Sequence, residues 1–419
     1  MPSVTSVSSF SRQFRVLVVG GSYGGLSAAL TLLDLSHGRV SRFNHTPDAQ
    51  PPQKQIPVQI TVVDERDGFY HLIGSPRALA CEKYASKSWT KFEDIPALNS
   101  PNIRFLRGSV NSVDCQSKVA RILDAQTKEM RKEKYDFLIA SSGLRRVFPT
   151  VPQSLRRDEF LEEAKKHTDD IRNAHDGIVV IGGGAVGVEM ATELRMLHPD
   201  KKITLIHSRD RMLSAEPLPS DFQDRVGSIL DESGVKLIFG QRVVDTTAIE
   251  TEGGRRIWKL ELADRRNIYA GHVMNAVSKC VPTSSYLPKE ALTEEGYVKI
   301  QASTQFSQNF PNADHHFAVG DMASWSGIKR CGAAMHMGYH AGNNAHQLML
   351  SEASNTKPEF VTLQEVPPVM ALAMGKTAVT YTPDQGTKDG EDIHDIMFGD
   401  DMGYSICWNY MRMSEPFEA

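Results

Sequence analysis

The chain has 419 residues, of which 40% are hydrophobic and 23% charged, so it is long enough for two or three domains of ordinary globular composition. Its formal net charge of −4 argues against a nucleic-acid surface, and no apolar run reaches the ~18 residues that a membrane span needs. The five cysteines are scattered and form no C-x-x-C, which excludes a local redox dithiol motif and a zinc knuckle. We therefore expect reduced thiols and a cytoplasmic protein. The Ser-rich residues 1–14, which contain Arg12 and no acid, leave a mitochondrial location as the alternative.

The first predicted unit is a strand, a glycine loop and a helix. Residues 16–19 form a short hydrophobic run, the loop GGSYGG follows, and residues 26–35 have the pattern of a helix. Such a loop presents the free N–H groups of a helix N-terminus to a pyrophosphate. A second strand ends at Asp64, which is placed to accept the ribose hydroxyls of an adenosine. We interpret the Pro-, Gln- and Asn-rich residues 36–57 between them as a surface insertion.

A second unit repeats this plan further along the chain. A strand at residues 178–181 leads into the loop GGGAVG, and a helix is predicted over residues 187–197, with Glu189 just inside it. Two dinucleotide loops in one chain indicate a flavin nucleotide and a nicotinamide nucleotide. Hydride transfer between them requires both reactive rings in one cleft.

The strand after the second loop bears on the choice of nicotinamide nucleotide. It ends in His207, Ser208 and Arg209, with Arg211 two residues on and no carboxylate at its tip. A hydroxyl and guanidinium groups suit a 2′-phosphate, whereas a carboxylate suits the free ribose diol. We therefore expect NADPH to be accepted at least as well as NADH, with a solvated loop as the alternative interpretation of the arginines.

Three further stretches extend the pattern. Residues 134–146 predict a strand that runs into a Ser-Gly turn, and residues 272–287 predict a strand with a Pro-containing exit. Residues 315–325 predict a strand that ends at Gly320-Asp321. An Asp at a strand end beside a helix N-terminus can hydrogen-bond a polyol such as ribitol.

In this order, the stretches resemble the two-dinucleotide-binding-domain flavoproteins, the glutathione-reductase-like superfamily. Within it, residues 15–410 resemble the apoptosis-inducing-factor-like proteins of the AMID and ferroptosis-suppressor type. VVDERDGFYHLIGSPRA is similar to that group's pattern of Asp, Phe, His and Arg-Ala, and GDMASWSGIK places Lys329 where these relatives carry a lysine near the flavin. Two positions depart from the pattern: Ser22 replaces the second glycine of the first loop, and Val277-Ser278 stands where the superfamily has a glycine.

The resemblance implies an α/β fold with two Rossmann-like dinucleotide-binding domains, glutathione-reductase-like, and a small C-terminal α+β domain. The FAD-binding domain would be split into residues 1–148 and 284–350. The NAD(P)H-binding domain would occupy residues 149–283, and residues 351–419 would form the C-terminal domain that covers the flavin.

The resemblance also implies an FAD-dependent NAD(P)H oxidoreductase. Because C-x-x-C is absent, we expect electrons to pass from reduced FAD directly to a small-molecule acceptor such as a quinone. A tailoring oxidoreductase of a secondary-metabolite pathway and an apoptosis-inducing-factor-like redox signalling flavoprotein stay open as alternatives. We expect no nucleic-acid partner, leave peripheral membrane contact open and predict no oligomeric state.

Two side chains are candidates for catalysis. Lys329 would stabilise charge on the reduced flavin or deliver a proton to the acceptor, and Glu189 would orient the nicotinamide or pair with Lys329. Their plain alternatives are a surface lysine and a partner for the helix dipole. The residues expected to contact the cofactors are Gly20, Gly21, Ser22, Gly24, Gly25, Asp64, Arg77, Val110, Gly143, Gly182, Gly184, Gly187, Ser208, Arg209, Gly320 and Asp321.

Three other features receive a structural interpretation. Cys331 lies near the expected flavin edge, but a lone cysteine is read as a small packed hydrophobe. His336 and His340 have the spacing of a metal pair, yet no acid stands at ligand spacing, so we expect helix packing and no metal site. The acidic residues 389–401 are interpreted as a solvated loop.

Overall fold

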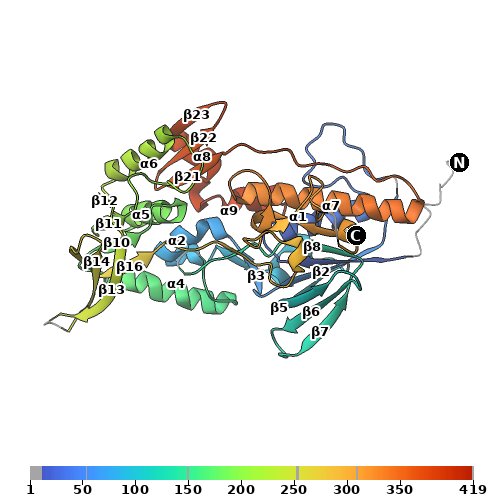
Figure 1. Cartoon of the computed structure of the whole chain (residues 1–419), viewed down its shortest axis with the longest axis horizontal. Coiled ribbons are helices and arrows are strands. Elements are labelled where there is room, and N and C mark those ends of the chain that lie inside the picture. Colours follow the sequence, from blue (N-terminus) through green and yellow to red (C-terminus); the bar gives the residue numbers. More distant parts are fainter. Residues whose placement is uncertain (1–11, 53, 149–150, 252–253, 308–309, 418–419) are drawn as a thin grey trace.

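The computed structural model describes residues 12–52, 54–148, 151–251, 254–307 and 310–417. The molecule is elongated, with one large sheet towards one end and a smaller parallel sheet towards the other (Figure 1). Residues 1–11, which carry most of the presequence-like composition, lie outside the described residues. Arg12 is described, and its guanidinium pairs with Asp136 and Glu352 at 3.3 Å each.

The larger sheet has seven strands in the order β19-β8-β1-β2-β5-β6-β7. Five of them are parallel neighbours: β19 (His316–Ala318), β8 (Phe137–Ala140), β1 (Phe14–Val19), β2 (Val58–Asp64) and β5 (Ile103–Asp114). An antiparallel extension adds β6 (Val119–Asp124) and β7 (Met130–Lys134). Helix α1 (Tyr23–Ser36) is buried along its whole length, because α7 (Cys331–Ser354) packs over it (Figure 1). The largest buried cluster lies between these helices and the sheet.

The smaller parallel sheet has four strands in the order β12-β11-β10-β16. Their bounds are Lys236–Ile238, Ile203–Ile206, Ile178–Ile181 and His272–Asn275. The helices α4 (Arg157–Arg172), α5 (Ala185–Leu197) and α6 (Ser220–Glu232) lie around it. An antiparallel sheet packs on it through a separate buried cluster and consists of β13 (Val243–Glu250), β14 (Arg256–Leu262) and β15 (Asn267–Ala270).

Short elements connect the two sheets. The chain crosses from one to the other beside a two-stranded pairing of β9 (Leu144–Arg145) with β17 (Val281–Pro282). Other short strands and α-helices before the C-terminal part are β3 (Gly68–Tyr70), α2 (Ser75–Ala80), α3 (Glu82–Ala85), β4 (Trp89–Lys91), β18 (Val298–Lys299) and β20 (Ala323–Ser324).

The C-terminal part packs against both halves of the molecule. It contains the antiparallel strands β21 (Met370–Met374), β22 (Thr377–Thr382) and β23 (Gly386–Gly390), then α8 (Glu391–Met397) and α9 (Tyr404–Tyr410). Leu372 and Val379 belong to the buried cluster of the smaller sheet. Cys407 and Met411 belong to the cluster of the larger sheet, so the C-terminal part bridges the two (Figure 1).

Two interpretations from the sequence are wrong. The acidic stretch is not a loop: α8 lies within it, because Glu391 and Asp392 stand at the helix N-terminus, where acids favour the helix dipole. The stretch between α1 and β2 is not all surface, since Arg42 is buried and pairs with Asp34 at 2.8 Å. The predicted domain boundaries stay a prediction, although α7 continues past residue 350 to Ser354.

Candidate active site

The two glycine loops have the same backbone geometry. Gly20 has φ +109° and Gly182 has φ +110°, a region that L side chains rarely adopt. A Cβ on Gly25 would lie 1.8 Å from the carbonyl oxygen of Gly20, and a Cβ on Gly187 would lie 1.8 Å from that of Gly182. The first and last glycines of each loop are therefore required by the fold itself, because helix and strand meet there.

The middle position of the loops is different. Ser22 is the N-cap of α1 with φ −107°, and Gly184 is the N-cap of α5 with φ −79°, angles that any residue adopts. A Cβ on Gly184 would meet no atom within 4 Å. The fold therefore tolerates a side chain at this position, which explains why the first loop can carry Ser22.

Asp64 ties the first loop to the end of β2. Its Oδ2 accepts the N–H of Gly21 at 2.6 Å, and its Oδ1 accepts the N–H of Arg66 at 2.8 Å. Burial raises the pKa of Asp64, while the charge of Arg66 and the two N–H donors oppose that rise. The Nε atoms of Arg66 and Arg107 are buried and have no partner among the described residues, and Arg107 stands opposite Asp64 in the β2–β5 register. Unsatisfied donors beside an acid at the end of such a strand would suit the nucleotide half of FAD, and the role of Asp64 towards it stays a prediction.

A cluster of charged groups stands where β19 ends. Asp321 follows this strand, and its Oδ2 lies 3.4 Å from Nη2 of Arg146. Nζ of Lys329 donates to the carbonyl oxygen of Ala323 at 2.5 Å and lies 5.5 Å from the ring centroid of Tyr297. Burial lowers the pKa of Lys329 and raises that of Asp321, and each charge opposes the shift of the other.

The structure therefore brings Asp321 and Lys329 together, and it adds two residues that the sequence analysis did not single out. Arg146 comes three residues after Gly143, and the β9–β17 pairing holds the segment before it beside the other half of the chain. Tyr297 precedes β18 and carries no motif. Only the charged stretch after the Ser-Gly turn could have indicated Arg146.

Glu189 does not pair with Lys329. Its Oε1 accepts the N–H of Ala373 on β21 at 3.3 Å, and the residue is 8% exposed. Burial raises the pKa of Glu189 to about 8, and the neighbouring Glu193 adds to the rise. The reason for the difference is tertiary: β21 covers this face of α5, so the side chain meets the C-terminal sheet.

The other predicted contacts are spread over the larger half. The guanidinium group of Arg77 is bound by other residues of the chain: its Nε donates to Glu193 at 2.8 Å, and its Nη1 donates to the carbonyl of Asp400 at 2.6 Å.

Val110 lies at a register shift in β5 and packs partly against the core. A Cβ on Gly143, which has φ +66°, would meet no atom within 4 Å, whereas a Cβ on Gly24 would lie 3.2 Å from a carbonyl oxygen of α7. Their roles towards a cofactor stay predictions.

The end of β11 carries the residues expected near a 2′-phosphate. Nδ1 of His207 accepts the N–H of Gly183 at 3.1 Å, which fixes this strand end against the second loop. Ser208 and Arg209 are exposed, and Nη1 of Arg209 donates to the carbonyl of Ser214 at 2.7 Å. Arg211 instead pairs with Asp224 on α6 at 3.0 Å. Arg209 is therefore the less committed of the two guanidinium groups.

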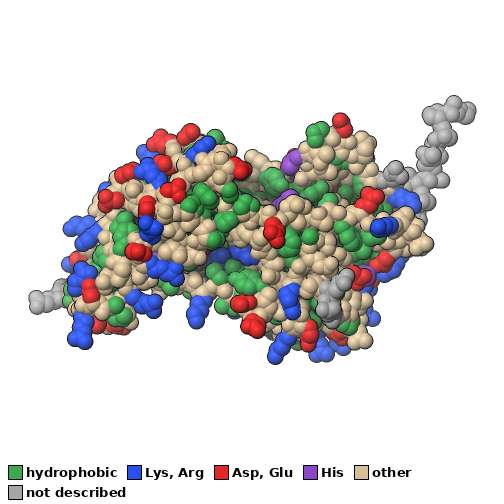
Figure 2. Space-filling view, turned by 45° about the horizontal axis from the view of Figure 1, so that its top comes forward, with side chains coloured by type: hydrophobic (Ala, Val, Ile, Leu, Met, Phe, Trp, Pro, Cys, Tyr) green, Lys and Arg blue, Asp and Glu red, His purple; other side chains and the backbone are tan. Residues whose placement is uncertain are grey.

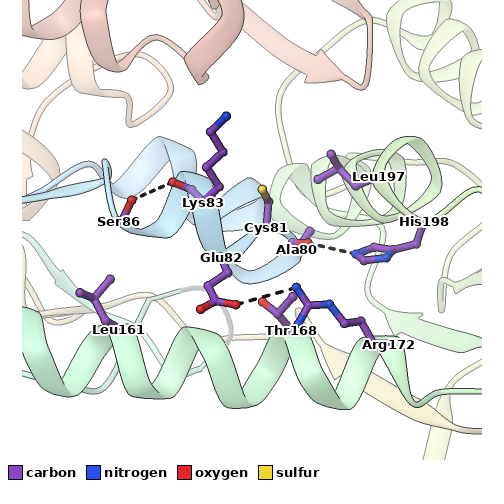
Figure 3. A pocket seen from close by; sticks show the side chains of 10 residues that line it. All are labelled: Ala80, Cys81, Glu82, Lys83, Ser86, Leu161, Thr168, Arg172, Leu197 and His198. Carbon is purple, nitrogen blue, oxygen red and sulfur yellow. Dashed lines mark hydrogen bonds and ion pairs between the residues drawn. The ribbon is translucent and has the colours of Figure 1, made fainter.

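One face of the molecule is hollowed near its middle, and hydrophobic side chains border the hollow (Figure 2). A separate cavity of about 650 Å³ lies between α2, α3, α4 and α5, with Cys81 and Lys83 among its lining residues (Figure 3). Two of its polar side chains are paired: Arg172 lies 3.8 Å from Glu82, and the His198 ring contacts the carbonyl of Ala80 at 3.0 Å. None of the predicted site residues lines it, so this cavity is not the candidate active site.

Comparison with known proteins identifies the family. Residues 14–338 match the family described as pyridine nucleotide-disulphide oxidoreductase. The chain belongs to this family. Oxidoreductase OXR1 of Ajellomyces capsulatus is 51% identical over 416 residues, which cover 98% of this chain and 90% of that protein. Ferroptosis suppressor protein 1 of Homo sapiens is 24% identical over 426 residues, which cover 98% and 100%.

Solved structures share the fold. The NAD-dependent persulfide reductase from A. fulgidus superposes with a TM-score of 0.65 at 18% identity, over 87% of this chain and 63% of that chain. The chain thus spans less than two thirds of that reductase. A water-forming NADH oxidase from Lactobacillus brevis, bound to NADH, gives a TM-score of 0.63 at 18% identity, over 88% and 74%. The predicted α/β fold and the predicted resemblance are confirmed.

Members of this family typically use FAD with NAD(P)H, and this oxidoreductase is of the ferroptosis-suppressor and apoptosis-inducing-factor type. Among the described residues, no helix is both long and apolar enough to cross a membrane. Within the same part of the chain, no group of three His, Cys, Asp or Glu is arranged to hold a metal ion.

Proposed function

We propose that the protein transfers a hydride from NAD(P)H to FAD and passes the electrons directly to a small-molecule acceptor of the quinone class. The observation that carries this proposal is the half-buried cluster of Lys329, Asp321 and Arg146 at the end of β19. Bound FAD would take up two electrons as a hydride and release them to the acceptor.

The chain's own residues divide the binding between the two halves. The first loop and Asp64 would hold the FAD nucleotide, and Asp321 would accept a hydrogen bond from the ribitol chain. The second loop, with the free N–H groups at the start of α5, would hold the pyrophosphate of NAD(P)H.

Lys329 would serve the acceptor. A quinone gains negative charge on its oxygens as it takes up electrons, and a nearby ammonium group stabilises that charge and donates a proton. Burial already lowers the pKa of Lys329, which makes its proton easier to give up. The bond to the carbonyl of Ala323 fixes the direction of the ammonium group.

An anaerobic stopped-flow experiment tests this assignment in two halves. In the first half, NADPH or NADH bleaches the flavin; in the second, the reduced enzyme meets a short-chain quinone, oxygen or a small disulfide. We expect the quinone to react fastest. Lys329→Met should slow the quinone step by roughly 10²-fold, because proton donation contributes about that much, and should leave bleaching within about twofold. Lys376→Met, a change at an exposed lysine between β21 and β22, is the matched control.

Other results would favour the alternatives. Slow reaction with every quinone but rapid reaction with another organic substrate would support a biosynthetic tailoring enzyme. Bleaching without turnover of any acceptor would support a signalling flavoprotein. An equal effect of Lys329→Met and Lys376→Met on the quinone step would remove Lys329 from the site.

We also propose a cytoplasmic location. All five cysteines are free, and reduced thiols are typical of that compartment. Fractionation of cells that express the tagged protein tests this, and recovery with mitochondria would overturn it.

A further inference from the structure

The cavity between α2, α3, α4 and α5 lies where the two halves of the molecule meet. The segment that carries α2 and α3 connects β2 to β5 of the larger sheet, whereas α4 and α5 lie around the smaller parallel sheet. Small-molecule sites are frequent at the junction of domains, and most have volumes of roughly 300–1,000 Å³. With about 650 Å³, the cavity has the size and the position of a ligand site.

The lining of this cavity combines apolar and charged side chains. Leu161 and Leu197 contribute apolar surface. Lys83 and Arg172 are positively charged, and Glu82 is negatively charged. In Figure 3, Leu161 and Leu197 stand on opposite sides of the group, and Glu82 reaches from α3 towards Arg172 on α4. An apolar wall with one surplus positive charge suits an organic anion.

Both cations keep capacity for a ligand. Nη1 of Arg172 donates to Asp169 at 2.8 Å, but its Nη2 lies 3.8 Å from Glu82, which is beyond hydrogen-bond distance. The side chains of Arg172 and Glu82 are 54% and 47% exposed, so water screens this ion pair and it holds Arg172 only weakly. Lys83 is exposed, and its ammonium group has no hydrogen-bond or ion-pair partner in the part of the chain that the structure describes. A carboxylate can therefore accept from Nη2 of Arg172 without displacing any hydrogen bond among those residues.

Two other polar side chains of the lining donate to backbone carbonyls. Oγ1 of Thr168 donates to the carbonyl of Ala164 at 2.9 Å. The His198 ring donates through Nε2 to the carbonyl of Ala80 at 3.0 Å, because a carbonyl oxygen only accepts. With these two donors already used, the two cations are the groups that select the charge of a ligand.

We propose that this cavity binds a small carboxylic acid with an apolar body, of the size of a medium-chain fatty acid. The carboxylate accepts a hydrogen bond from Nη2 of Arg172, and the charge of Lys83 adds electrostatic attraction. The apolar body packs against Leu161 and Leu197, which removes its surface from water. None of the residues proposed to bind FAD, NAD(P)H or the acceptor lines the cavity, so this site is separate from the proposed redox chemistry.

Cys81 reports on occupancy, because it lines the cavity and is half-buried. The FAD-loaded protein is treated with iodoacetamide, with and without octanoate and in the absence of NAD(P)H, and alkylation of each cysteine is followed by mass spectrometry. Calorimetry gives the Kd of octanoate, which should lie below about 1 mM. At about tenfold above Kd, octanoate should slow alkylation of Cys81 roughly tenfold, because nearly all sites are occupied. Cys280, which is exposed and does not line the cavity, should react at an unchanged rate.

Other probes and variants test the role of the charge. Octylamine, which has the opposite charge, should not protect Cys81, and 1-octanol should bind about tenfold more weakly than octanoate. Lys83→Met and Arg172→Met should each weaken octanoate binding about fivefold or more. Lys87→Met, a change at an exposed lysine outside the lining, is the matched control and should leave Kd unchanged.

Three results would overturn the proposal. They are a lack of octanoate binding, equal protection of Cys81 by octylamine, and a Kd within about twofold of the wild type in both Lys83→Met and Arg172→Met. Retained FAD and an unchanged Tm show that each variant is folded. Because no readout uses NAD(P)H or an acceptor, the outcome is independent of the proposed function.

Discussion

Replacement of Gly184 by valine isolates nucleotide binding from folding. In the structure, a Cβ at this position meets no atom within 4 Å, and φ is −79°, so the protein alone accommodates the side chain. A pyrophosphate at the start of α5 must approach this backbone closely, because the first amides of a helix have no intrahelical partner. Gly184→Val should therefore fold, bind FAD and lose affinity for NAD(P)H.

The size of the effect follows from the contacts that the side chain would displace. A hydrogen bond from an amide to a charged phosphate contributes roughly 1.5–3 kcal/mol, so the loss of one or two such bonds costs about 3 kcal/mol. Since 1.4 kcal/mol is a factor of ten, Kd should rise on the order of 100-fold. The ratio of flavin to protein absorbance and the Tm should stay close to those of the wild type.

The assay is titration of the FAD-loaded protein with NADP⁺ by calorimetry, together with the NADPH dependence of flavin bleaching. Gly227→Val is the matched control, because Gly227 on α6 also has open space around its Cβ position and lies outside the loop. A Kd within about twofold of the wild type, in a variant that retains FAD, would show that the second loop is not the nucleotide site.

Three further changes test other parts of the site. Asp321→Ala should weaken FAD binding about 5- to 150-fold, the equivalent of roughly 1–3 kcal/mol for a hydrogen-bond acceptor lost from a half-buried site. Flavin fluorescence titration measures this, and unchanged retention would remove Asp321 from the FAD site. Arg209→Ala should lower kcat/KM for NADPH about tenfold and leave kcat/KM for NADH unchanged. Arg211→Ala should lower kcat/KM for NADPH by a smaller factor, because Arg211 already pairs with Asp224. A wild type that prefers NADH tenfold, with no change in Arg209→Ala, would refute this. Glu189 has a pKa near 8 in the folded state against an ordinary 4.5, so the folded protein retains a proton that the unfolded chain has lost, and stability falls as pH rises from 4.5 to 8. The unfolding free energy of Glu189→Gln should therefore rise relative to that of the wild type by up to ~4 kcal/mol as pH increases from 5 to 9, with a matching rise in Tm. A constant difference across this range would contradict the shifted pKa.

The sequence pattern correctly predicted those elements whose position is determined by the local backbone geometry. The strand at residues 178–181 and both glycine loops stand where the sequence placed them, because tight turns at positive φ leave few alternatives to glycine. Helix starts were less accurate: α1 begins at Tyr23, three residues before the predicted start, since the loop glycines are already helical. A helix boundary depends on capping geometry, which a hydrophobic pattern does not specify.

Several contacts that the sequence did not reveal depend on the C-terminal part. Glu189 meets Ala373, and Arg77 meets Asp400. Each pair joins residues from distant segments, and no spacing rule relates them. The interpretation of the acidic stretch as a solvated loop was wrong for a related reason. Asp389 pairs with Arg225 at 2.7 Å, so these charges hold the C-terminal sheet against α6 and are not all solvated.

The difference between Ser22 and Gly184 gives the most direct physical information about function. If the fold required glycine at the middle position, both loops would need it, yet Ser22 occupies the same N-cap position with an extended backbone. The glycines that the fold does require, Gly20 with Gly25 and Gly182 with Gly187, are present in both loops. Gly184 therefore leaves space that the protein does not need. A phosphate of NAD(P)H bound at the first amides of α5 would account for that space, and Gly184→Val tests this assignment.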